Sequence, residues 1–170
     1  MTTNELLLDA FGRIPDLVHD VVSGLKPEEL TYRVDSRANS IAWLVWHLSR
    51  IEDDHIAAAA GIPQVWTSAG WAQRWDLPPD DEDTGYGHTP RQVAAITGDA
   101  ELLRGYFDAV HAMTIGFVST LTAADLDRIV DESWDPPVTL GVRLVSVAGH
   151  DFEQAAQATF VRGIVERRRR

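Results

Sequence analysis

The stretch Ser40-Ile-Ala-Trp-Leu-Val-Trp-His-Leu-Ser-Arg-Ile-Glu-Asp-Asp-His55 has the spacing of an amphipathic helix. Its large aliphatic residues recur every three or four positions and so share one helical face: Ile41, Leu44, Val45, Leu48 and Ile51. Asn39 and Ser40 come at its start, and their side-chain oxygens can accept hydrogen bonds from the free N–H groups of a first turn. The stretch therefore predicts a buried helix that begins near Ser40.

Polar side chains lie close to this apolar face. His47 and Asp54 are seven positions apart, which places them about 20° from each other around the helix, at the edge of the apolar face. His55 falls within that face. An imidazole and a carboxylate on the seam between two helices can build a polar site inside a bundle. The alternative is a core helix whose histidines are only hydrogen-bonded.

Three further segments have helical periodicity, and together they predict an all-α protein built as a four-helix bundle. The first is Asn4–Ser23, which Pro15 should kink or split near residues 12–14. The second is Val93–Leu121, and the third begins at Thr139, which is a favourable N-cap residue. Strand-like alternation of useful length is absent from the sequence. Two short helices complete the prediction, one opened by Pro27 and ending at Leu30 and one over Ala123–Ile129.

A long segment without periodicity, Gly61–Thr89, separates the second and third helices of the bundle. A loop of this length is usually functional or disordered. Its aromatic residues argue against disorder, because such side chains are stabilised by burial: Trp66, Trp71, Trp75 and Tyr86. We expect an ordered loop packed over one end of the bundle, with the three tryptophans mostly buried.

The composition narrows the classes of function. The 170 residues are expected to form a single domain, 1–170. They carry 15 basic and 26 acidic side chains, a net charge of −11, which disfavours nucleic-acid binding. The four arginines 167–170 are expected to form a basic, frayed end of the last helix.

The absence of a long apolar run, a signal peptide and cysteine leads to expectations about cellular location and metal ligands. It has no apolar run near the roughly 18 residues that span a bilayer, so we expect no membrane association. The first residues do not resemble a signal peptide, which makes the cytoplasm the expected location. With no cysteine, disulfides and thiol nucleophiles are excluded, and any metal must be held by His, Asp, Glu, Gln or water.

The last helix carries a second polar group. Arg143, His150, Gln154 and Gln157 fall within roughly 60° of one another around it. His150 and Gln154 are one turn apart, so both side chains can reach one point, as the ligands of a metal do. The alternative is an ordinary solvent-exposed face. The neutral carbonyl of Gln suits hard cations better than zinc or nickel.

Two segments resemble the DinB/YfiT-like metalloenzyme superfamily: Asn39–His47 and Gly149–Gln157. Asp83–Thr89 and Trp134–Arg143 also resemble its actinobacterial branch, which includes mycothiol-dependent maleylpyruvate isomerase. The resemblance spans nearly the whole chain. It implies an up-down-down-up four-helix bundle, often dimeric, with one divalent metal in a three-residue site.

The resemblance also implies the ligands. The second helix of the family supplies one His, matched here by His47, and the last helix supplies two residues, matched by His150 and Gln154. Gln154 departs from the family, which has His at that position. His55, Asp54 or Glu153 could compensate, or the site could be degenerate. The metal expected is zinc or nickel, with mycothiol as the implied co-substrate.

Substrate contacts are expected from arginines, because guanidinium groups bind carboxylates through two hydrogen bonds. The candidates are Arg50, Arg143 and Arg74, and Asp54, His55 and His88 are placed near the same pocket. The function expected is a metal-dependent thiol S-transferase, isomerase or hydrolase acting on a small molecule, as a homodimer. The alternatives are a non-catalytic bundle that binds a small molecule or acts in stress, and a dimerisation module without a ligand.

Overall fold

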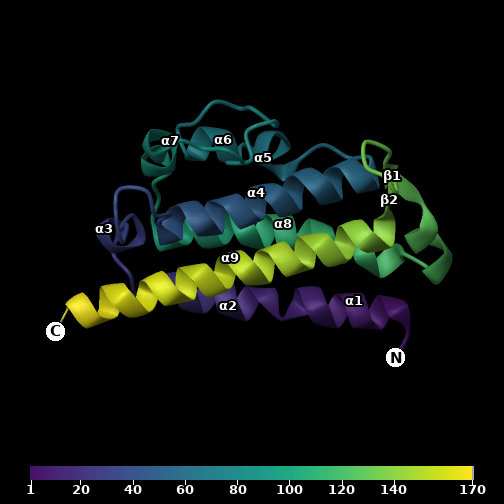
Figure 1. Cartoon of the computed structure of the whole chain (residues 1–170), viewed down its shortest axis with the longest axis horizontal. Coiled ribbons are helices and arrows are strands. Elements are labelled where there is room, and N and C mark those ends of the chain that lie inside the picture. The colour runs from purple at the N-terminus through teal and green to yellow at the C-terminus, as the bar shows by residue number, and fades with distance from the viewer. Residues whose placement is uncertain (170) are drawn as a thin grey trace.

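Three long helices run along the molecule in the computed structural model, which describes residues 1–169 (Figure 1). They are α4 (Ile41–Ala60), α8 (Ala100–Thr120) and α9 (Leu140–Arg168). Two shorter helices, α1 (Thr3–Gly12) and α2 (Ile14–Val22), follow one another and pack against α8 and α9. Helix α4 packs closely against both α8 and α9. α4 and α8 start at the end of the molecule where α9 finishes (Figure 1).

Most helix ends agree with the sequence signals. The Ser40 side chain accepts a hydrogen bond from the Trp43 N–H at 3.1 Å, and α4 ends at Gly61 in the left-handed conformation. The first helical pattern is split at Arg13, with Pro15 in the opening turn of α2. Thr139 caps α9. Pro27 opens α3 (Pro27–Leu30) as predicted.

The predicted helix Val93–Leu121 is instead two helices, α7 (Pro90–Ala95) and α8. Gly98 lies in the break between them. Asp99 starts α8 as an N-cap, its side chain accepting from the Leu102 N–H at 2.8 Å. The Trp75 indole donates to the Thr97 carbonyl at 2.6 Å, so a distant tryptophan stabilises the break.

A small hairpin precedes α9, although the sequence predicted no strand. Residues Ala123–Asp127 form a 3₁₀ helix, η1, rather than a helix that extends to Ile129. β1 (Ile129–Asp131) then pairs antiparallel with β2 (Val138–Thr139). Strands of two and three residues are too short to give a readable alternation, which explains why the pattern was missed.

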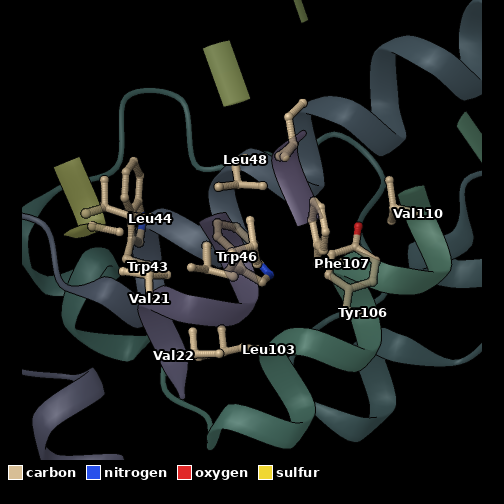
Figure 2. Packing of buried hydrophobic residues seen from close by; sticks show 14 of the residues in the cluster. Val21, Val22, Trp43, Leu44, Trp46, Leu48, Leu103, Tyr106, Phe107 and Val110 are labelled. Atoms are coloured by element: carbon tan, nitrogen blue, oxygen red, sulfur yellow. The ribbon is translucent and has the colours of Figure 1, made fainter. Parts of the chain in front are cut away.

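The core is built by side chains from α1, α2, α4, α8 and α9. Figure 2 labels members from α2, α4 and α8: Val21, Val22, Trp43, Leu44, Trp46, Leu48, Leu103, Tyr106, Phe107 and Val110. Trp46 is 1 % exposed and Tyr106 and Phe107 are fully buried. In the described range, residues 1–169, every helix is too short or too polar to cross a membrane.

The segment 61–89 lies beside α4 and α8 rather than over one end of the molecule, which corrects the predicted position (Figure 1). It contains α5 (Val65–Ser68) and α6 (Trp71–Arg74). Its three tryptophans are 2–8 % exposed, which confirms the predicted burial. Their rings surround Tyr106 of α8 with centroids 5.2–5.7 Å away: Trp66, Trp71 and Trp75.

The basic end of α9 docks onto α3 instead of fraying. Arg168 donates to the Tyr32 hydroxyl at 2.9 Å, and Arg169 forms an ion pair with Glu29. These contacts order a run of like charges that on sequence grounds looked solvent-exposed. Arg170, the last residue of the predicted tail, lies outside the described residues.

Candidate functional site

His47 of α4 and His150 of α9 meet at the seam between these helices. Their ring centroids are 5.0 Å apart and the ring planes are 79° apart. His47 is 6 % exposed, and His150 is half-buried. Two imidazoles separated by about a hundred residues of sequence are therefore direct neighbours.

The hydrogen bond to His47 fixes which ring nitrogen is free. Its Nδ1 lies 2.6 Å from the Thr84 carbonyl oxygen, which can only accept, so Nδ1 carries the hydrogen. Trp43 stacks on the ring at 4.4 Å. Burial lowers the pKa of His47 to about 4, against the opposing effect of the Thr84 carbonyl. At neutral pH the ring is therefore uncharged, with the Nε2 lone pair available for a ligand.

His150 supplies a second neutral imidazole. Its Nε2 is buried and has no hydrogen-bond partner within residues 1–169. Burial lowers the pKa of His150, and the nearby His55 lowers it further. A buried nitrogen without a partner costs free energy unless another species binds it. Both rings thus have the state that a divalent metal requires.

Gln154 is half-buried and lies one turn beyond His150 on α9. No group of three or more His, Cys, Asp or Glu side chains arranged to hold a metal occurs in the described chain. Glu153 is exposed, and Asp54 and His55 belong to a separate pocket.

The segment after residue 82 is pressed against His47, which sequence reasoning did not detect. Gly85 has a positive φ of 89°, and a Cβ there would lie 2.8 Å from the Trp46 ring and 3.0 Å from His47 Nδ1. Glycine is thus required both for its conformation and for its lack of a side chain. Thr84 is missing from the predicted site because it contributes its carbonyl, which any residue carries. The Gly85-Tyr-Gly87 pattern was the available signal.

His88 contacts Trp43. Its Nδ1 accepts from the Trp43 indole N–H at 3.1 Å, so its Nε2 donates to Asp83 at 2.8 Å. The ring also stacks on Trp46, and the side chain is only 7 % exposed. Both ring nitrogens of His88, which the sequence placed near the substrate pocket, therefore have protein partners.

Arg50, a predicted substrate contact, is engaged by protein groups instead. It is fully buried, and its guanidinium donates to the carbonyls of Asp81 and Asp83 and to the Gln64 side chain. It also contacts Tyr106. Arg50 therefore holds segment 61–89 against the helices. Arg74, the weaker candidate, is exposed and its guanidinium lies over the Trp71 ring.

Three other predicted residues do come together. Arg143, His55 and Asp54 line one pocket of about 470 Å³. Arg143 Nη2 donates to Asp131 at 2.7 Å, and Arg143 Nη1 lies 3.3–3.4 Å from the His55 ring nitrogens. His55 Nδ1 is 3.3 Å from Asp54. The seam between α4 and α9 thus carries this pocket as well as the histidine pair.

A buried acid pair beside the site was not anticipated from sequence. Glu52 of α4 and Asp151 of α9 are fully buried, and within residues 1–169 their carboxyl oxygens have no hydrogen-bond partner. The His111 Nδ1 lies 3.8 Å from Glu52 Oε1. Burial raises the pKa of Glu52 to about 7 and that of Asp151 well above its usual range. The neighbouring Glu52 also raises the pKa of Asp151, because two carboxylates close together in a buried setting disfavour each other's charge.

This pair predicts a pH-dependent stability. Both pKa values are higher in the folded protein than in the unfolded chain, so the stability contributed by the protonated pair is complete below about pH 4 and falls as the pH rises through 7. Glu52→Gln removes the ionisation. We expect it to stabilise the protein by about 1–2 kcal/mol at pH 8, with a smaller gain at pH 5. Urea unfolding at both pH values measures the change in the free energy of unfolding, and Glu28→Gln, at an exposed position, is the control. A gain in stability that is equal at the two pH values would contradict the prediction.

Comparison with known proteins places the chain in a family. The model of the DinB superfamily matches residues 10–158. A solved structure described as the conserved protein of locus from Enterococcus faecalis is 28 % identical, covers 97 % of this chain and 98 % of its own, and superposes with a TM-score of 0.89. No curated protein matches. With its helical fold and a family match over most of its length, the chain belongs to the DinB superfamily.

Proposed function

We propose that this protein is a metal-dependent enzyme that holds one divalent cation, zinc or nickel, through His47, His150 and Gln154. One observation carries the proposal: the Thr84 carbonyl holds His47 as the Nδ1–H tautomer, which leaves its Nε2 free. The His150 ring centroid lies 5.0 Å from that of His47, and the buried Nε2 of His150 has no partner among the described residues. A carbonyl partner for the other ring nitrogen is the usual arrangement behind a metal-binding histidine.

The protein's own groups support this role. Trp43 and the backbone at Thr84 and Gly85 fix the orientation of the His47 ring, and burial keeps both imidazoles uncharged. A metal bound there would supply a Lewis acid that lowers the pKa of a coordinated water or thiol. The adjoining pocket at Arg143 would orient the substrate beside it.

The finer assignments belong to the same proposal. A low-molecular-weight thiol such as mycothiol is the proposed co-substrate, for S-transfer, isomerisation or hydrolysis. Support comes from the two further segments that resemble the mycothiol-dependent branch, since Asp83–Thr89 contacts His47 and Trp134–Arg143 lines the pocket. We also propose one domain with the up-down-down-up arrangement of four helices, which acts as a homodimer.

A non-catalytic role is the second candidate. It is favoured by Gln154, whose neutral amide replaces the third imidazole of the family pattern and should bind zinc or nickel more weakly. In this case the protein would retain the fold and a small-molecule pocket without metal chemistry.

Metal titration separates the two candidates. Chelator-treated wild-type protein is titrated calorimetrically with Zn²⁺ and with Ni²⁺. We expect one equivalent to bind, and His150→Ala to weaken binding at least about tenfold. His19→Ala is the control, because His19 is paired with Asp108 on a different face of the molecule. Absence of binding by wild type would favour the non-catalytic role, and equal binding by all three proteins would place the metal elsewhere.

A further inference from the structure

The pocket at Arg143 has a fixed, partly enclosed shape. It has a volume of about 470 Å³ and lies between the second half of α4, strand β1 and the start of α9. Arg143 and His55 form its polar side, and Ala58, Val130 and Trp134 form its apolar side. Such a combination of an apolar wall with a few converging polar groups is typical of small-molecule sites.

Arg143 retains binding capacity in this pocket. Its Nη2 is taken by Asp131, but no protein acceptor reaches its Nε in the described chain. Nη1 is nearly equidistant from both ring nitrogens of His55. An in-plane approach at these distances would collide with Cε1 between them, so Nη1 lies over the ring face. A charged carboxylate would be a far stronger acceptor for these N–H groups than the imidazole.

The acidic groups of the pocket already have partners. Asp131 accepts from the Ser133 N–H and hydroxyl in addition to Arg143. Asp54 accepts from the Gln64 amide at 3.0 Å and faces His55. These contacts reduce the repulsion that the two carboxylates would exert on an anion, and they leave Arg143 as the group with unused donors.

The apolar wall is open to a ligand. Trp134 is 67 % exposed, although its large ring gains free energy when it is covered. Ala58 is small and exposed, so it leaves space beside the indole. A ligand that reaches Arg143 can therefore lay an apolar body against Trp134.

The position of the pocket connects it with the histidine pair. Arg143 is seven residues before His150 on the same helix, about 10 Å along the axis and near the same face. His55 occupies the corresponding position on α4 and is close enough to influence His150 electrostatically. The pocket at Arg143 and the histidine pair thus lie about two helical turns apart along the same two helices.

We propose that this pocket binds the carboxylate of a small organic acid whose apolar body packs on Trp134. The acid is thereby placed with its far end toward His47 and His150, as the substrate of the proposed enzyme. The link to catalysis rests on the proposed function, whereas the binding of the acid does not.

The test uses metal-free, chelator-treated protein and three probes of one shape. These are 3-phenylpropanoate, the neutral 3-phenylpropanamide and the cationic 3-phenylpropylamine, each titrated by calorimetry or by NMR. We expect the acid to bind at least about tenfold more tightly than the amide, the difference that a charged hydrogen bond provides. Preference for the amide or the amine, or no difference among the three, would overturn the proposal.

Substitutions in the pocket test whether the acid binds there. Arg143→Gln should abolish the preference for the acid, and Ala58→Phe should block both acid and amide by filling the pocket while leaving every charge in place. Arg104→Gln, an exposed arginine on α8, is the matched control. If Arg143→Gln does not fold, Ala58→Phe still tests the proposal. Undiminished binding of the acid to the Ala58→Phe variant would show that the acid does not bind in this pocket. If the wild-type protein binds no metal but still prefers the acid, the proposed metal-dependent enzyme is rejected and the carboxylate pocket is retained.

Discussion

Arg50→Ala is expected to destabilise the protein by about 3–5 kcal/mol, the usual cost of removing one member of a buried ion pair. Arg50 and Asp53 are both fully buried, with Arg50 Nη1 3.6 Å from Asp53 Oδ2. Burial raises the pKa of Asp53, although its hydrogen bonds from the Val65 and Trp66 N–H groups oppose this effect. Without the guanidinium, the Asp53 carboxylate loses its counter-charge.

The same substitution should release segment 61–89. Arg50 donates to two backbone carbonyls of this segment, at Asp81 and Asp83, and its guanidinium lies 5.0 Å from the Trp66 ring centroid. Those carbonyls would need water once the donor is lost. We therefore expect limited proteolysis within 61–89 to accelerate strongly, together with the loss of stability.

Chemical denaturation and timed proteolysis of the variant measure both effects. Arg74→Ala is the matched control. Arg74 lies within segment 61–89 and, like Arg50, places its guanidinium over a tryptophan ring, but it is exposed. It should change stability by no more than about 1 kcal/mol. If Arg50→Ala stayed within that range and resisted protease, Arg50 would not be the residue that anchors the segment.

Gln154→His is expected to raise the affinity for zinc or nickel by about 10- to 100-fold. The change restores an imidazole one turn after His150, on the helix that packs against α4 beside His47. A gained metal ligand should match at least the 10- to 100-fold effects known for groups that only orient ligands. The metal-bound variant should also unfold at a higher temperature, because the metal binds the folded state.

Calorimetric titration of both proteins, with melting curves with and without metal, tests this prediction. Gln157→His is the matched control, since it adds a histidine to the same helix two turns from His150, beyond the reach of a shared ligand. Equal and negligible binding by wild type and Gln154→His would mean that the histidine pair is no longer a metal site. The non-catalytic role would then be the better account.

Local signals in the sequence were sufficient for most of the helices. Capping by Ser40 and Thr139, the break near Pro15 and the turn opened by Pro27 act within a few residues, so their effects could be read directly. The break before α8 was missed because the Thr97 carbonyl is bound by Trp75, which is 22 residues away in the chain. The hairpin before α9 was missed because its strands have only three and two residues.

The sequence by itself determined the helical class, the resemblance to the DinB superfamily and the candidate residues His47, His150, His55 and Arg143, because residue type and helical spacing are local properties. Only the tertiary structure decided which of these share a site. In the folded protein both ring nitrogens of His88 have hydrogen-bond partners, and Arg50 is buried beneath segment 61–89. The Thr84 carbonyl accepts a hydrogen bond from His47. Tautomer, burial and available donors depend on atoms brought together from distant parts of the chain, and no local pattern encodes them.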